Sequence, residues 1–153
     1  VQTRQATVDE AWFETLYTRD GVAVTSARFV VRNRRQQFLR VTLPEDSEVW
    51  SAAVDGRPQT PALETGSDSP TVLLNIVSAA DAFEVTMVYA TETSPLGTLG
   101  RVDVELATPA TVPTPTTSRL VLPGGVASVP PDRSPAPLHA CPLRVSPSGR
   151  PLR

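Results

Sequence analysis

The stretch AWFETLYTRDGVAVTSARFVV, residues 11–31, decides the fold. In its first half Phe13 and Tyr17 share one parity, and successive side chains alternate in the period of two that a β-strand shows. Asp20-Gly21 follows, and this pair supplies the positive φ that a tight hairpin turn needs. The second half is rich in β-branched residues and alternates again. The stretch therefore predicts a β-hairpin.

The same period of two continues along the chain. It is clear in residues 38–43 and clearest in residues 83–89, where apolar and polar side chains alternate. No segment combines a capping residue with a useful length of 3.6-residue apolar period, which argues against helices. We predict an all-β protein: an antiparallel β-sandwich of about seven to eight strands with a disordered proline-rich C-terminal tail. The residues expected to face the core are Ala23, Ala27, Phe29, Val31, Leu39, Val41, Leu43, Phe83, Val85, Met87 and Tyr89.

Two further segments give less regular strands. In residues 48–54, simple alternation groups Val49 with Ala53 on one face. It groups Trp50 with Ala52 and Val54 on the other. Residues 71–77 form a continuous apolar run, which is typical of a strand buried on both faces.

Proline content changes along the chain and indicates its organisation. Seven of the 16 prolines lie in residues 130–153, and none lies before Pro44. A proline-rich end without apolar period is typical of disorder, although a GC-rich gene translated in another reading frame gives the same composition. The expected segments are a β-sandwich domain at 1–106, a Thr/Pro-rich linker or edge at 107–118, a possible extra strand at 119–128 and the disordered tail at 129–153.

The charge distribution limits the classes of partner. All 14 basic residues are arginine and the net charge is −2, with eleven acidic residues against two arginines in residues 45–105. An acidic middle does not favour a nucleic-acid partner. The chain has one cysteine and no apolar run long enough for a membrane-spanning helix. It begins with Val1 rather than methionine, so we expect a fragment, a processed form or an engineered segment.

One cluster of arginines is a candidate for contact with an anion or a partner. Arg32, Arg34, Arg35 and Arg40 lie between two apolar runs. Single-strand nucleic-acid binders combine such a basic patch with stacking aromatic rings. The same residues also suit the solvated tip of a hairpin, where arginine pairs with acidic neighbours across strands. We favour the solvated hairpin and keep the anion-binding loop as an alternative.

Motifs for catalysis and metal binding are missing from the sequence. His139 and Cys141 are two residues apart in the proline-rich tail with no second pair, so no zinc site, other cofactor or catalytic residue is predicted. Trp12 and Trp50 are candidates for a carbohydrate platform, because sugars stack on exposed aromatic rings. With aromatic residues at only 5% of the chain, we favour core packing for these aromatic residues and keep the carbohydrate platform as an alternative.

Several motifs carry a resemblance to a known class of domain. They are TRDG (18–21), VRN (31–33), QFLRVTLP (37–44), VWSAAVDG (49–56) and FEVTMVY (83–89). Over residues 8–123 the chain resembles the poorly characterised β-sandwich modules of large exported or membrane-anchored bacterial cell-envelope proteins. The resemblance implies an extracytoplasmic location and a scaffolding or contact role, and it carries no catalytic residue.

These observations lead to one expected function and two alternatives. We expect a noncatalytic structural or protein-interaction module of a larger bacterial envelope or secreted protein. Its partners would be other domains of the same polypeptide or envelope proteins. A carbohydrate-binding module is the first alternative, and an arginine-loop binder of anions or nucleic acid is the second.

Overall fold

The computed structural model describes residues 6–33, 36–64, 69–76, 82–95, 100–110, 116–123, 125–129 and 141–145. Within these ranges the chain forms strands and turns without any helix, which confirms the prediction of an all-β protein. No helix that could cross a bilayer is found there either. The strands are β1 Thr7–Tyr17, β2 Val22–Arg32, β3 Phe38–Thr42, β4 Ser47–Val54, β5 Arg57–Gln59, β6 Ala62–Glu64, β7 Thr71–Asn75, β8 Ala82–Glu92, β9 Gly100–Val104, β10 Thr108–Pro109, β11 Thr116–Leu122, β12 Gly125–Val129 and β13 Cys141–Val145.

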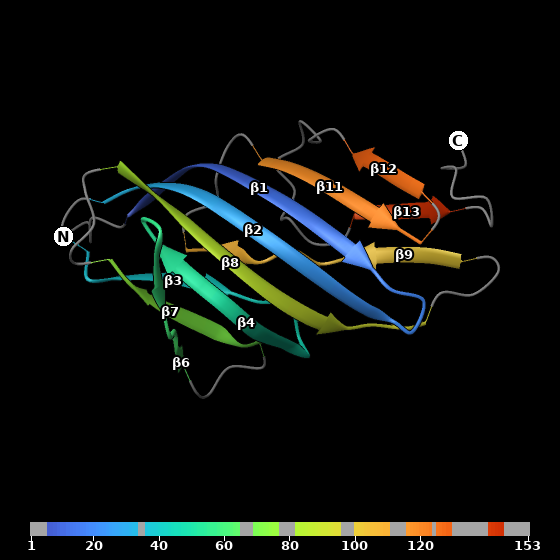
Figure 1. Cartoon of the computed structure of the whole chain (residues 1–153), viewed down its shortest axis with the longest axis horizontal. Coiled ribbons are helices and arrows are strands. Elements are labelled where there is room, and N and C mark those ends of the chain that lie inside the picture. Colours follow the sequence, from blue (N-terminus) through green and yellow to red (C-terminus); the bar gives the residue numbers. More distant parts are fainter. Residues whose placement is uncertain are drawn as a thin grey trace.

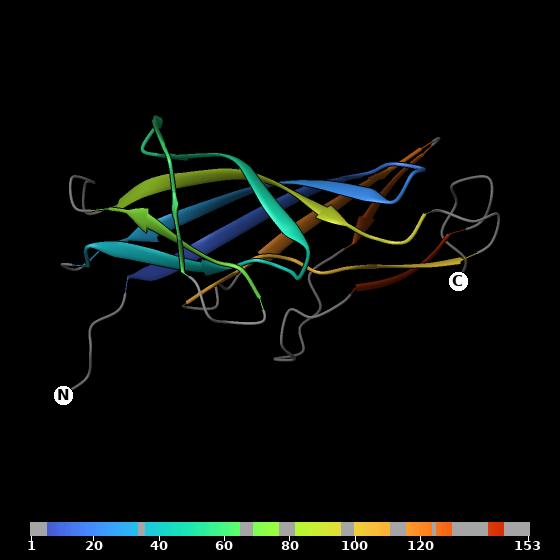
Figure 2. The same ribbon diagram turned by 90° about the horizontal axis from the view of Figure 1, so that it is seen from below.

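The strands form two layers (Figures 1 and 2). One layer is a seven-stranded sheet with the order β12-β11-β1-β2-β8-β4-β5. The other layer holds a four-stranded sheet, β10-β3-β7-β6, and beside it a two-stranded sheet, β13-β9. Neighbouring strands run antiparallel except β1 and β11, which are parallel. The arrangement is the predicted sandwich, with more strands than expected because several are only two or three residues long.

The predicted hairpin joins β1 and β2. Gly21 has a φ of +89°, and the Thr18 amide donates to the Val22 carbonyl across the turn at 2.9 Å. The Gly21 carbonyl in turn accepts hydrogen bonds from the Thr93 amide at 2.7 Å and the Thr93 hydroxyl at 2.9 Å. The turn is therefore attached to the segment that follows β8, in addition to closing its own hairpin.

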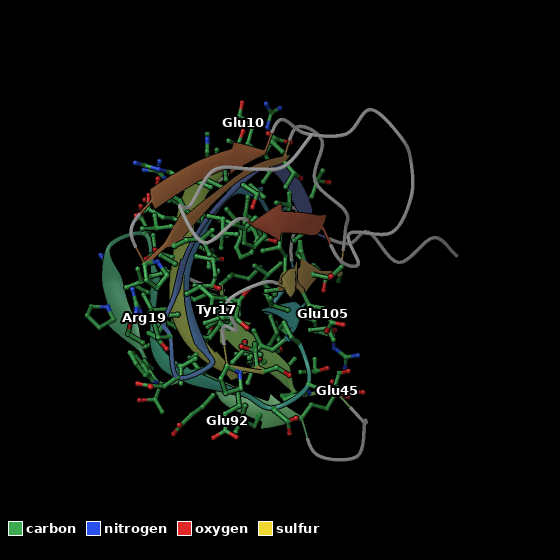
Figure 3. All side chains as sticks on the ribbon, turned by 90° about the vertical axis from the view of Figure 1, so that its right-hand side faces the viewer. Glu10, Tyr17, Arg19, Glu45, Glu92 and Glu105 are labelled. Atoms are coloured by element: carbon green, nitrogen blue, oxygen red, sulfur yellow. The ribbon has the colours of Figure 1, made fainter. Side chains whose placement is uncertain are left out.

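The core lies between the layers and uses the expected side chains. Phe13 and Phe29 meet edge to face, with ring centroids 5.6 Å apart and planes at 78°. In the end-on view Tyr17 lies on the inner side of the large sheet, whereas Glu10 and Glu92 lie at the periphery (Figure 3). All residues expected to face the core are buried: Ala23, Ala27, Phe29, Val31, Leu39, Val41, Leu43, Phe83, Val85, Met87 and Tyr89. Phe13 and Tyr17, which share one parity on β1, are buried as well.

Strand β4 departs from the predicted alternation. Its register with β8 shifts between Val49 and Ser51, which inserts Trp50 as the extra residue of a β-bulge. Val49 packs against the core, and after the bulge Ala52 and Val54 are buried as well. The predicted grouping of Trp50 with these two residues was wrong, because a bulge reverses the parity of everything that follows it.

Strand β7 differs from the prediction in its burial. Val72, Leu74 and Ile76 are buried, but Leu73 is half-buried and Asn75 is exposed. The expectation of a strand covered on both faces was wrong, because the four-stranded sheet has one face toward the core and the other toward solvent.

The C-terminal third contributes to all three sheets. β10 forms an edge of the four-stranded sheet within the region expected to be a linker or edge, and β11 lies between β1 and β12 inside the large sheet. In the expected tail, Cys141–Val145 form β13, which pairs with β9. β9 provides backbone hydrogen-bonding partners that no local pattern among the prolines indicates. Residues 130–140, with His139, and 146–153 lie outside the described residues.

Candidate functional site: the outer face of the large sheet

Both predicted aromatic candidates lie on the outer face of the seven-stranded sheet. Trp12 alternates with the buried Ala11 and Phe13 on β1, and it is half-buried. Trp50, on β4, has 59% of its surface exposed. The two strands are three positions apart in the sheet, which separates them by roughly 14 Å at the usual strand spacing. The fold therefore brings the two side chains onto one surface without bringing them into contact.

Trp12 is partly covered by a neighbouring side chain. The guanidinium carbon of Arg28, directly opposite on β2, lies 4.9 Å from the centroid of the Trp12 ring. Arg28 also approaches Glu84 on β8, with Nη1 3.8 Å from Oε2. A guanidinium over an indole is a cation–π contact that stabilises both groups. One face of the Trp12 ring is thus occupied, and Trp50 is the more accessible of the two rings.

The candidate arginine loop is partly neutralised. Arg32 Nε lies 2.6 Å from Asp9 Oδ2, and Arg40 Nη2 lies 3.4 Å from Glu64 Oε1. Arg34 and Arg35 lie outside the described residues. Two of the four arginines therefore make the cross-strand pairs expected of a solvated hairpin, and the anion-binding loop stays a prediction.

The start of this loop is held by an asparagine that sequence reasoning missed. The Asn33 Nδ2 donates to the carbonyls of Gln36 at 3.0 Å and Ile76 at 3.3 Å, and its Oδ1 accepts from the Gln36 amide at 2.8 Å. Asparagine commonly bonds to the backbone at the start of a turn, so its position after β2 was the available signal. Asn33 fixes the approach of the loop to the end of β7.

A buried polar network also went unnoticed in the sequence. The hydroxyls of Thr15 and Thr25 lie 2.9 Å apart across β1 and β2. The Tyr89 hydroxyl, on β8, accepts the Ala107 amide hydrogen at 3.0 Å and bonds to the side chain of Thr25. Burial raises the pKa of Tyr89 to about 12, and the hydrogen bonds oppose that rise. The network ties three strands to the segment before β10, so its chemistry serves the fold.

Removing the Tyr89 hydroxyl should reveal this role. Below the ordinary phenol pKa of 10.0, the raised pKa of Tyr89 contributes its full share to the free energy of unfolding. This contribution declines as pH rises toward about 12, because in that range the unfolded chain loses the Tyr89 proton while the folded chain keeps it. Two pKa units correspond to about 3 kcal/mol at most. Tyr89→Phe should cost about 1–3 kcal/mol near neutral pH, because the Ala107 amide loses its acceptor. It should also flatten the alkaline decline, as urea unfolding at several pH values would show. If the loss of stability at alkaline pH persists in Tyr89→Phe and disappears in Tyr17→Phe, Tyr89 is not the residue that causes it.

A shallow depression beside the β4–β5 turn is the other feature of note. Its lining is mixed, with Asp55, Arg57 and Thr60 beside Val54 and Pro58. Gln59 spans it, its amide donating to the Asn75 carbonyl at 2.8 Å and accepting from the Asn75 amide at 3.1 Å. This side chain therefore joins the edge of the large sheet to β7. In the part of the chain that the structure describes, no three His, Cys, Asp or Glu side chains are grouped to hold a metal ion.

Comparison with known proteins gives similarity of structure only. No family model matches the chain, and no curated protein matches its sequence. Yeast LTA4 hydrolase is similar with a TM-score of 0.63 at 12% identity, over 94% of this chain and 28% of that one. A two-domain M1 zinc metallopeptidase bound to L-tryptophan is similar with a TM-score of 0.53 at 15% identity, over 80% of this chain and 34% of that one. The M1 zinc metallopeptidase of Deinococcus radiodurans bound to a Tyr-Ser-Ala substrate is similar with a TM-score of 0.51 at 16% identity, over 79% of this chain and 33% of that one.

These similarities are limited in extent and in identity. This chain spans about a third or less of the length of each of the three proteins. At such identities the likeness shows a shared fold. The chain thus has a β-architecture that also occurs as a part of longer proteins.

Proposed function

We propose that the chain is a noncatalytic structural or protein-interaction β-sandwich module of a larger protein. The observation that carries the proposal is the recurrence of its fold as 28–34% of longer chains. Those chains are named as a hydrolase and metallopeptidases, and the matched fold makes up a minority of each. The further proposal, that the larger protein is a bacterial envelope or secreted protein, rests on the motif resemblance alone.

The use of polar groups inside the sandwich supports a structural role. The Thr15 and Thr25 hydroxyls bond to one another, and the Tyr89 hydroxyl bonds to the Ala107 amide. Among the described residues no buried side-chain polar atom lacks a partner. The inner polar groups therefore bond neighbouring segments to one another. A partner would contact the outer surfaces.

Sheet edges are one such surface. A strand at an edge offers backbone groups to which another chain can add. In the described residues three edge strands, β5, β6 and β10, have two or three residues, and β5 and β10 contain Pro58 and Pro109. The other edge strand of the large sheet, β12, has five residues and no proline. Strand addition to the large sheet by a neighbouring domain is therefore expected at β12.

The size and location of the native polypeptide test this proposal. An antibody raised against the chain should detect a product much larger than 16.4 kDa in the extracytoplasmic fraction of the producing cells. A large product in the cytoplasm would retain the module and contradict the location. A product of about the size of this chain alone would contradict the proposal itself.

A carbohydrate-binding module is the second candidate, and the exposure of Trp50 favours it. A sugar stacking on this ring should change tryptophan fluorescence, and Trp50→Ala should abolish the change. Trp12→Phe should preserve it, because Arg28 covers one face of that ring. The measurement is a fluorescence titration with a broad oligosaccharide panel. A flat response throughout the panel would end this candidacy.

A further inference from the structure

A row of apolar side chains crosses the outer face of the large sheet. Leu16 on β1 lies opposite Val121 on β11 and Val24 on β2, and Val24 lies opposite Ala90 on β8. Val88 is the next outward residue of β8. On β4, Val49 lies opposite Tyr89 and Ser51 lies opposite Val88, and Trp50 is the bulge residue between them. We call this set the outer apolar patch; its members are Leu16, Val24, Val88, Ala90, Val121 and Trp50.

The two largest side chains of the outer apolar patch are exposed to solvent. Leu16 is 49% exposed and Trp50 is 59% exposed. Isolated apolar side chains on a surface are ordinary, but a contiguous set that includes a large aromatic residue is typical of an interaction site. Tryptophan in particular contributes strongly when a partner covers it.

The charged strand residues beside the outer apolar patch are acidic. Glu48 lies opposite Ala90, and Glu92 is the next outward residue of β8. Both are exposed, and neither forms an ion pair with a described residue; the same is true of Arg19 in the turn at this end.

The other cations on this face are already paired. Besides Arg28 and Arg32, whose partners are given above, Arg119 Nη1 lies 3.5 Å from Glu14 Oε2. Of the carboxylates on this face, Glu48 and Glu92 beside the outer apolar patch have no cation partner among the described residues, and neither has Glu10 at the far end of β1.

We propose that the outer apolar patch is the docking surface for a basic polypeptide segment, with apolar side chains flanked by arginine or lysine. The inference rests on the proposed function and names the surface and the chemistry of the partner. Covering Trp50 and Leu16 removes apolar surface from water, and cationic flanks complete the ion pairs that Glu48 and Glu92 lack.

A polypeptide fits this surface better than a lipid or a sugar. Unpaired carboxylates repel the anionic headgroups that attract peripheral proteins to membranes. The remaining members of the patch are aliphatic, and they offer a sugar no second stacking ring.

The probe for the test is a labelled peptide in which three central apolar residues are flanked on each side by two arginines. Its twin carries glutamates in place of the arginines. Fluorescence anisotropy with the full chain should show binding of the basic peptide, weakened at least about tenfold by Trp50→Ala or Leu16→Ser. Glu48→Gln combined with Glu92→Gln should remove the preference over the twin and most of the salt dependence.

Two controls separate this surface from others and from misfolding. Leu63→Ser changes an apolar residue on β6 that is 65% exposed, and it should leave binding unchanged. The chain has two tryptophans, so in Trp12→Phe the emission reports Trp50 alone. Binding should shift that emission to shorter wavelength whether or not the other variants fold.

Equal binding of the two peptides, equal loss in Leu63→Ser, or tighter binding to vesicles of anionic lipid than to the peptide would overturn the inference. An absent emission shift in a saturated complex would do the same. In those cases a large extracytoplasmic product would still uphold the proposed function. Conversely, binding with all the expected variant effects would uphold the docking surface even if the native product proved small.

Discussion

Phe29→Ala is expected to lower the free energy of unfolding by about 4 kcal/mol, the largest effect of any single substitution considered. The Phe29 side chain is 0% exposed and belongs to the principal cluster of the core. The substitution removes the edge-to-face contact with Phe13 and leaves a cavity between two layers that cannot easily close. The measurement is urea unfolding of the variant and the parent.

Phe38→Ala is the matched control, because it removes the same side chain from the outer face of β3. Phe38 is 47% exposed, so about half of its surface meets water in the folded chain as well. We expect a loss of about 1 kcal/mol or less. Similar losses in the two variants would mean that Phe29 does not lie in the core, and the register of β2 would have to be revised.

Gly21→Ala is expected to have the second largest effect, about 3 kcal/mol. A φ of +89° costs an L-residue about 1–2 kcal/mol, and alanine has no means of avoiding it. Its Cβ would also lie 2.5 Å from the Thr93 carbonyl oxygen and 2.8 Å from the Pro95 nitrogen. These are backbone atoms, so relief requires the turn or the segment after β8 to move. That movement would break the hydrogen bonds between Gly21 and Thr93.

Gly56→Ala separates the cost of the positive φ from the cost of the steric overlap at the Cβ. Gly56 has a φ of +72°, but no atom lies within 4 Å of the position that a Cβ would take. Its loss should be limited to the backbone cost of about 1–2 kcal/mol. The comparison is made by urea unfolding, and the excess in Gly21→Ala measures the steric part. A Gly56→Ala variant as unstable as Gly21→Ala would contradict the close packing between the first turn and the end of β8.

Local pattern was sufficient for much of the fold. The alternation in β2, β3 and β8 correctly assigned the inward residues, because the side-chain period of a strand is set by backbone geometry. In β1 it correctly grouped Phe13 with Tyr17, and the structure decided that this group faces the core. The bulge at Trp50 could not be predicted in this way. Its extra residue is recognisable only from the register between β4 and β8, and nothing in the local sequence specifies that register.

The candidate site was predictable only in its components. Trp12 and Trp50 stood out as aromatic residues of uncertain placement, and Arg32 and Arg40 as part of a basic cluster. Their surroundings come from distant parts of the chain: Trp12 meets Arg28, while Arg40 meets Glu64. The acidic rim of the outer apolar patch likewise combines β4 and β8, so no continuous stretch of sequence displays it.

The sequence by itself determined the period of each long strand, the position of the first turn and the all-β class. These depend on φ/ψ preferences and on the alternation of neighbouring side chains, which act over a few residues. Only the tertiary structure decided that β11 pairs in parallel with β1, and that Trp12, Leu16 and Trp50 share one outer face. Strand pairing between distant segments is selected by the packing of the whole core, and no local preference encodes it.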